Sequence, residues 1–351
     1  MARRITPEQS ASAAAAGNGR GDRKPRARVA PVNARDAYKD VPILQPPTWN
    51  NDIAIYFLLG GVSSGAFVLG TLLDAAGTKE SRLARAAKFV SFGTMLLCPP
   101  FLIHDLGKRT RFHHMLRIFK PSSPMNLGSW TLTTHGLFAT LVAMRQLAKA
   151  GKLPLIGPVM RAIPEQLLTI GGVPTALTLG GYTGVLIGTT SIPVWSTSPL
   201  LGGLFMASAL STGAAATVLA AALTGEDDPR GQATVTPFRI AAGCAEIALL
   251  GGYLVTSGKA ARPLLKGREL LLLLGAVIGT VAALILEVRA SADSRHSRPA
   301  SASGAALTLI GGACLRWSIV RAGHVSAADR EGTIAATKPS KNAPGWGLER
   351  S

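Results

Sequence analysis

Five polar side chains in or beside apolar stretches of the chain are placed to do chemistry. They are Asp52, Tyr56, His104, His135 and Tyr182. If the apolar stretches cross a membrane as helices of alternating direction, all of them lie toward the face where the first stretch starts. A mostly apolar pocket with a few polar groups suits a molecule with an apolar body and carbonyl oxygens. Tyr can donate a hydrogen bond to such an oxygen, and His or Asp can relay protons to it. We therefore expect these residues to bind a molecule of this kind and to exchange protons with it.

The same side chains also have structural explanations. Asp52 stands at a helix start, where a carboxylate caps well. The two tyrosines could anchor their helices as amphipathic aromatics, and a histidine on an apolar helix is often a satisfied core residue. Asp105 closes an apolar stretch, where it could transfer protons or pair with Lys108 or Arg109.

A second set of ionisable residues falls inside the later apolar stretches. Glu246 follows Arg239 by seven residues, which is about two helical turns and ~10 Å along much the same helix face. An ionisable residue inside a membrane span is costly and indicates a function. We expect Arg239, Glu246 and Glu287 to form a polar ladder that moves protons from the opposite face toward the first group of residues, with Arg239 as a candidate partner of Glu246. The alternative is a static ion pair that locks two spans together.

Composition indicates an integral membrane protein. The chain has 351 residues, of which 47% are hydrophobic and 16% are charged, against about 25% charged in soluble domains. The net charge of +18 does not indicate a nucleic-acid partner, because the basic residues lie in the tails and between apolar stretches, where they face lipid headgroups. The cysteines form no Cys-x-x-Cys pair, so we expect no metal and no haem in this protein.

The fold we expect is an all-α integral membrane domain with eight transmembrane helices arranged as two four-helix bundles. The expected spans are 52–74, 86–104, 127–146, 166–190, 199–223, 237–258, 269–288 and 303–321. The second span should be interrupted near its end by Pro99 and Pro100. The domains would be a disordered basic tail at 1–48, the membrane domain at 49–322 and a second disordered tail at 323–351. The orientation in the membrane stays open.

The connection between the second and third expected spans has a dense pattern of polar and basic residues. It reads Asp-Leu-Gly at 105–107, Arg-Phe at 111–112, Met-Leu at 115–116, Phe-Lys-Pro at 119–121, Ser-Pro-Met at 123–125 and Gly-x-Trp at 128–130. This pattern resembles the corresponding loop of the polysulfide reductase membrane-subunit family, the NrfD-like proteins. The resemblance extends over roughly 49–290.

The resemblance implies a membrane anchor subunit that binds menaquinone or ubiquinone in the bacterial inner (plasma) membrane. Such a subunit exchanges electrons with a ferredoxin-like iron–sulfur partner, docked over loop 105–125, that serves a molybdenum or tungsten catalytic subunit. It is a quinone-reactive part of an oxidoreductase rather than a stand-alone enzyme. By resemblance, Tyr56 replaces a quinone-contacting His, Tyr182 matches a quinone-contacting Tyr, and Arg239 matches an Arg linked with a proton path.

Two other classes stay open at this point. A secondary transporter would use Gly- and Pro-interrupted spans to form its substrate site. A haem b anchor would need paired His ligands, for which His104 and His135 are candidates. The substrate of the complex, the direction of electron flow and any pumping of protons do not follow from the sequence.

Overall fold

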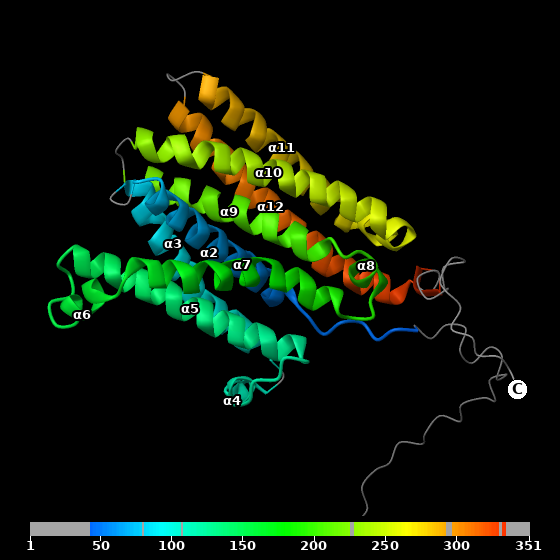
Figure 1. The fold of residues 1–351 in the computed structure, drawn as a ribbon. Coiled ribbons are helices and arrows are strands. Elements are labelled where there is room, and N and C mark those ends of the chain that lie inside the picture. Colours follow the sequence, from blue (N-terminus) through cyan, green and yellow to red (C-terminus); the bar gives the residue numbers. More distant parts are fainter. Residues whose placement is uncertain are drawn as a thin grey trace, which may run out of the picture. The chain divides into compact units, whose positions relative to one another are not determined.

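The computed structural model of the protein describes residues 43–78, 81–106, 108–224, 228–292, 297–329 and 332–334. Within these ranges the regular elements are all helical, as expected (Figure 1). The α-helices are α2 (Asn51–Ala75), α3 (Arg82–Asp105), α4 (His114–Arg117), α5 (Pro124–Lys149), α6 (Gly157–Ala162), α7 (Glu165–Gly188), α8 (Pro193–Ser196), α9 (Leu201–Ala222), α10 (Pro229–Ser257), α11 (Gly267–Ala292) and α12 (Ser297–Ala328). Two 3₁₀ segments are η1 (Arg109–Arg111) and η2 (Gly258–Leu265).

Seven of the described helices are long and apolar enough to cross a membrane. They are α2, α3, α7, α9, α10 continued by η2, α11, and α12. Helix α5 has 26 residues and coincides with the third expected span, but its amino-terminal half carries Asn, Ser, Thr and His side chains that lower its apolar character. The criteria of length and composition therefore support seven of the eight expected spans.

Helix starts explain why some spans differ from the expected limits. The Ser81 hydroxyl caps α3 by accepting a hydrogen bond from the Ala84 N–H at 3.0 Å. Asp228 caps α10 by accepting from the Gly231 N–H at 2.9 Å, and its second oxygen accepts from the Leu83 N–H at 3.1 Å. Because this cap precedes Pro229, α10 begins well before the expected start at 237.

The expected interruption at Pro99 and Pro100 is wrong. Helix α3 contains both prolines and continues to Asp105. Two adjacent prolines remove only two backbone donors from a long helix, and neighbouring helices can support such a segment inside a membrane domain. His104 therefore stands on regular helix.

The expected start of the carboxy-terminal tail at residue 323 is also too early. Helix α12 continues to Ala328, and in this added part the His324 ring nitrogen lies 2.9 Å from the Trp49 carbonyl oxygen. This contact joins positions far apart in the sequence, so local pattern alone does not reveal it. Residues 335–351, like residues 1–42, lie outside the described residues.

Helices α2 and α9 form the centre of the helical assembly. Helix α9 contacts α2, α3, α7, α10 and α12, and Figure 1 shows α10, α11 and α12 on one side of α9 and α5 on the other. A Cβ atom at Gly65 would overlap the Ala209 carbonyl, and one at Gly213 would overlap the backbone at Ala66. Small residues at a crossing allow close backbone approach, as in packed membrane helices. These contacts join the helices closely across α2 and α9, and they do not by themselves define the two expected bundles.

Two faces of the assembly are defined by the ends of α2. The proximal face holds the start of α2, the end of α3 and the short helices α4 and α8, whereas the distal face holds the end of α2, the start of α3 and α6 (Figure 1). On the proximal face the extended segment 43–50 leads into α2. Its Trp49 ring stacks on Trp195 of α8 with centroids 5.5 Å apart. The segment is thereby held against the helices.

Candidate functional site

Three of the expected site residues meet at the proximal face. His104 Nδ1 lies 2.7 Å from an Asp52 carboxylate oxygen, joining the end of α3 to the start of α2. The side chains are 58% and 25% exposed, so the pair faces the membrane surface. Asp105 accepts a hydrogen bond from the Asn50 N–H at 3.5 Å. Asp52, His104 and Asp105 therefore form one polar group at the mouth of the helices.

The two expected tyrosines lie beneath this polar group. Tyr56, one helical turn beyond Asp52, is 2% exposed, and Tyr182 is 6% exposed. The two phenols are near enough to interact electrostatically. The Tyr182 hydroxyl donates to the Pro124 carbonyl, whereas no hydrogen bond joins the Tyr56 hydroxyl to another described residue.

The surroundings of Tyr56 are apolar. Tyr56 belongs to a hydrophobic core cluster that also contains Ile53, Met95, Cys98, Leu132 and Leu179, with Phe101 and Leu102 packed against the cluster. A buried phenol in such a setting offers one polar handle within an apolar lining. The Tyr56 hydroxyl is therefore a single polar group in apolar surroundings.

His135 does not join the proximal group. It is fully buried on α5, and its Nε2 lies 3.0 Å from the Ser63 hydroxyl. Ser63 follows Asp52 by eleven residues on α2, which places it about 16 Å deeper. The expectation that all five residues converge on one pocket is therefore wrong, because helix depth separates His135 from the Asp52–His104 pair.

The connection between α3 and α5, called here the proximal loop, is held in shape by Asn126. The sequence analysis did not single out this residue. The Asn126 amide nitrogen donates to the Met115 carbonyl at 2.6 Å and to the Ile118 carbonyl at 2.9 Å, and its oxygen accepts from the Lys120 N–H at 2.7 Å. The Trp130 ring packs edge-on against Phe119, with centroids 5.9 Å apart. In the sequence, the feature that could have identified this residue is its position directly after Ser-Pro-Met at 123–125.

The later helices contain a buried ionic network. Arg239 is 4% exposed and forms an ion pair with Glu287, so α10 is tied to α11. Arg239 also donates to the Ser301 hydroxyl at 3.0 Å. A pocket lined by Arg239, Glu287 and Ser211 lies beside this pair. Two members of the expected ladder are thus in direct contact.

The candidate partner that the sequence suggested for Glu246 is wrong. Glu246 is 2% exposed and accepts a hydrogen bond from the Ser211 hydroxyl at 2.5 Å. The charged group that interacts with it is Arg316 of α12, not Arg239. Arg239 is instead paired with Glu287, because α10 turns its two charged side chains toward different neighbouring helices.

Arg316 is the main charged residue that the sequence reading missed. It is 1% exposed and donates from Nε to the Phe57 carbonyl at 3.1 Å and from Nη1 to the Ser208 hydroxyl at 2.9 Å. Ser208 is also within hydrogen-bonding reach of Glu246. An arginine in the middle of an apolar stretch was the signal that could have found it. Arg316 links Glu246 to the backbone beside Tyr56.

Comparison with known proteins identifies the family. Residues 43–328 match the family described as "Polysulphide reductase, NrfD". The chain belongs to the NrfD family. This confirms the resemblance first seen in the loop, and the match extends through α12. With seven helices able to cross a membrane, this NrfD-family member is a multi-pass membrane protein.

Three named proteins are similar to about half of this chain. The chain is similar to protein NrfD of Escherichia coli, with 29% identity over 52% of this sequence and 62% of that protein. It is similar to the C subunit of the selenate reductase of Mesobacillus selenatarsenatis, with 26% identity over 48% of this sequence and 46% of that protein. It is also similar to the C component of the polysulfide reductase of Wolinella succinogenes, with 28% identity over 49% of this sequence and 57% of that protein. The matches span less than two thirds of each of these relatives.

Proposed function

We propose that this NrfD-family protein is the quinone-reactive membrane subunit of an oxidoreductase complex. Its support is the family match together with the proximal group, in which Asp52 and His104 lie above the buried Tyr56. Two of the similar proteins are named as components of reductases. The location we propose is the bacterial plasma membrane, and the quinone is menaquinone or ubiquinone.

A bound quinone would supply two-electron, two-proton redox chemistry at this place. The Tyr56 hydroxyl, which has no hydrogen-bond partner among the described residues, would donate to a carbonyl oxygen. The Asp52–His104 pair and Asp105 would exchange protons between the pocket and the proximal surface. Tyr182 would tie the pocket to the loop, because its hydroxyl is held by the Pro124 carbonyl.

The proximal loop is the proposed docking surface for an iron–sulfur partner. It carries five basic side chains, at Lys108, Arg109, Arg111, Arg117 and Lys120. Among them stand exposed apolar side chains, including Ile118 at 66% and Phe119 at 56%. Mixed apolar and basic character suits a specific protein interface better than lipid headgroups alone. The partner would serve a molybdenum or tungsten catalytic subunit.

The same proposal includes eight membrane crossings. Helix α5 has the length of a span, and it packs against α3 and α7. Its polar half includes Ser129, Thr131 and His135, which are buried, so these three side chains face other helices rather than lipid. The eight helices would then form two sets of four in sequence order, α2 to α7 and α9 to α12, joined across α2 and α9.

Proton transfer is the proposed role of the buried network. Glu246 can hold a proton, and its hydrogen bonds to serine hydroxyls provide the next steps for transfer. Arg239 and Glu287 lie toward the distal face and Arg316 lies toward Tyr56, so the network extends in the direction that protons must travel. Arg316 and Arg239 would position the carboxylates, since guanidinium groups keep their protons.

Quinone binding by the full-length protein tests this proposal. A quinone analogue would be titrated into the protein in lipid nanodiscs while tryptophan fluorescence is measured. Saturable quenching is expected, and Tyr56→Phe should weaken it by about 2–10-fold, the equivalent of one hydrogen bond. Tyr253→Phe is the matched control, because that buried hydroxyl donates to the Val194 carbonyl at 2.5 Å. Equal effects of the two changes, or no saturable binding, would refute a quinone site at Tyr56.

The two rival classes predict different outcomes. A haem b anchor would show stoichiometric iron and a haemochrome spectrum in the purified protein. In the structure, His104 contacts Asp52 and His135 contacts Ser63, which does not favour a shared metal ligand pair. A transporter would purify without iron–sulfur or molybdenum subunits. Copurification of those subunits would support the proposed complex.

A further inference from the structure

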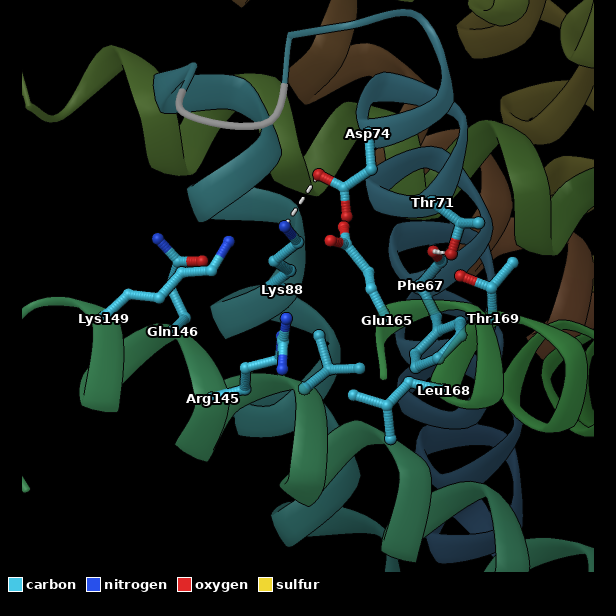
Figure 2. Close-up of a pocket in the computed structure, with 11 residues that line it drawn as sticks. Phe67, Thr71, Asp74, Lys88, Arg145, Gln146, Lys149, Glu165, Leu168 and Thr169 are labelled. Atoms are coloured by element: carbon cyan, nitrogen blue, oxygen red, sulfur yellow. Dashed lines mark hydrogen bonds and ion pairs between the residues drawn. The ribbon is translucent and has the colours of Figure 1, made fainter. Parts of the chain in front are cut away.

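A pocket at the distal face gathers both acidic and basic side chains. It lies between the end of α2, the start of α3, the end of α5 and the start of α7 (Figure 2). Its charged members are Asp74, Lys88, Arg145, Lys149 and Glu165. This pocket lies in the first half of the sequence, away from Arg239, Glu246 and Glu287 of the proposed proton network.

Two carboxyl groups meet in this pocket. Asp74 and Glu165 face one another in Figure 2, close enough for their carboxyl groups to interact. An ionised carboxylate only accepts hydrogen bonds, so a bond between two carboxyl groups requires that one of them carries a proton. Lys88, whose side chain is 8% exposed, donates to the other Asp74 oxygen at 2.7 Å. Two carboxyl groups placed in this way beside a buried cation are suited to share one proton.

The remaining polar groups leave this shared proton accessible from the pocket. One Arg145 nitrogen donates to backbone carbonyls at the end of α6, including that of Arg161 at 2.9 Å. Gln146 is 6% exposed, and its amide lines the pocket without a hydrogen bond to another described residue. An amide that opens into the pocket beside a carboxyl pair offers a place where water would be held.

Helix α2 connects this pocket to the quinone side. Residues 56, 60, 63, 67, 71 and 74 recur at spacings of three and four, so they share one helix face. From Tyr56 to Asp74 is 18 residues, or about 27 Å, which is close to the thickness of a bilayer core. Thr71 lines the pocket, and Ser63 lies midway along the same face. One face of α2 therefore carries polar groups across the membrane.

His135 of α5 contacts Ser63 at the middle of this face of α2, and its Nδ1 atom has no partner among the described residues. The Ser63 hydroxyl donates its single hydrogen to the Ser91 carbonyl at 2.8 Å, so it accepts from the His135 Nε2–H. Nδ1 of neutral His135 is then an acceptor, and it is buried without a partner among the described residues. The Phe67 ring both lines the distal pocket and packs edge-on against His135, with centroids 5.4 Å apart. His135 is thus a proton acceptor one ring away from the pocket.

We propose that the first half of the protein holds a second proton route, with the Asp74–Glu165 pair as its loading site and His135 as its relay toward the quinone. This inference rests on the proposed quinone function. Reduction of one quinone consumes two electrons, supplied by the iron–sulfur partner, and two protons. The route would supply protons from the distal face, opposite the proximal loop. Oxidation of quinol would reverse each transfer.

The deciding variant is Glu165→Gln, because glutamine keeps a donor to Asp74 but cannot exchange a proton. In the complete complex in liposomes, proton uptake at the distal face during quinone turnover should fall by about 100-fold, the lower end of the effect of a positioned acid–base group. His135→Gln, which can still bond to Ser63, should cause the same loss. Asp228→Asn is the control, since it is a carboxylate change at the same face; asparagine keeps the cap on α10 and gives up only the second oxygen's contact with the Leu83 N–H.

Infrared spectra provide a second measurement that does not need turnover. In the full-length protein in nanodiscs, the protonated carboxyl of the pair should give a carbonyl band that shifts on exchange into D₂O. Glu165→Gln should remove it and Asp228→Asn should keep it. If the wild-type complex shows no quinone turnover, the proposed function fails while this band still tests the pair. If turnover and distal proton uptake persist in both folded variants, or the band is absent from the wild type, the second route is refuted.

Discussion

The buried pair of Arg316 and Glu246 allows a quantitative test. Arg316→Met removes a guanidinium that donates to the Phe57 carbonyl, the Ser208 hydroxyl and the Gly312 carbonyl at 2.9–3.1 Å. Each hydrogen bond from a charged donor contributes about 1.5–3 kcal/mol. Methionine refills part of the volume and avoids the desolvation of a charge, which offsets part of this loss. The expected net destabilisation is about 3–5 kcal/mol after this offset, in the range found when one of two interacting buried charges is removed.

The assay is equilibrium unfolding of the full-length protein in detergent micelles. Arg321→Met serves as the control on the same helix, because the Arg321 side chain is 41% exposed and pairs with Glu269 at 3.3 Å. Its loss should cost less than about 1 kcal/mol. Adding Glu246→Gln to Arg316→Met should recover part of the stability, since the carboxylate no longer lacks a counter-charge. Additive effects in this double-mutant cycle, or equal losses for the two arginines, would refute the coupling.

Three further changes test the proximal face. Gly128→Ala should displace the Tyr182 ring, which occupies the space of the added Cβ, and should lower quinone affinity measured by fluorescence quenching; wild-type affinity would contradict this packing. Asn126→Ala removes three loop hydrogen bonds and should weaken binding of the iron–sulfur partner in pull-down assays, while unchanged binding would show that the loop keeps its shape without it. Asp52→Asn breaks the half-exposed contact with His104, so it should cost less than about 1 kcal/mol in unfolding yet slow quinone turnover; a large loss of stability with normal turnover would assign the pair a structural role.

The sequence predicted the helical class and most span positions because apolar length is a local property. The sequence analysis also grouped Arg239 with Glu287, and its alternative of an ion pair between two spans describes their contact in the structure. It did not predict the partner of Glu246, because that depends on the rotation of α10 against α12. The sequence did not predict that α10 starts at Pro229, where the Asp228 cap extends the helix. It also did not predict that α12 continues from 321 to Ala328, where His324 makes its distant contact with Trp49.

The charges of the distal pocket illustrate the same limit. Asp74 and Lys88 lie near span ends, where each alone resembles a headgroup-facing charge. Their contact with one another and with Glu165 requires three helices to end at one place, which no local pattern specifies. Arg316, by contrast, was visible in the sequence as a charge inside an apolar stretch.

The glycine crossing of α2 and α9 has a consequence for motion. At Gly65 and Gly213 the two backbones approach so closely that neither position has room for a methyl group. Alternating access requires one half of a transporter to rock against the other, and here such rocking would have to separate backbones that share the centre of the assembly. A rigid axis of this kind suits a protein in which electrons and protons move while the helices stay still.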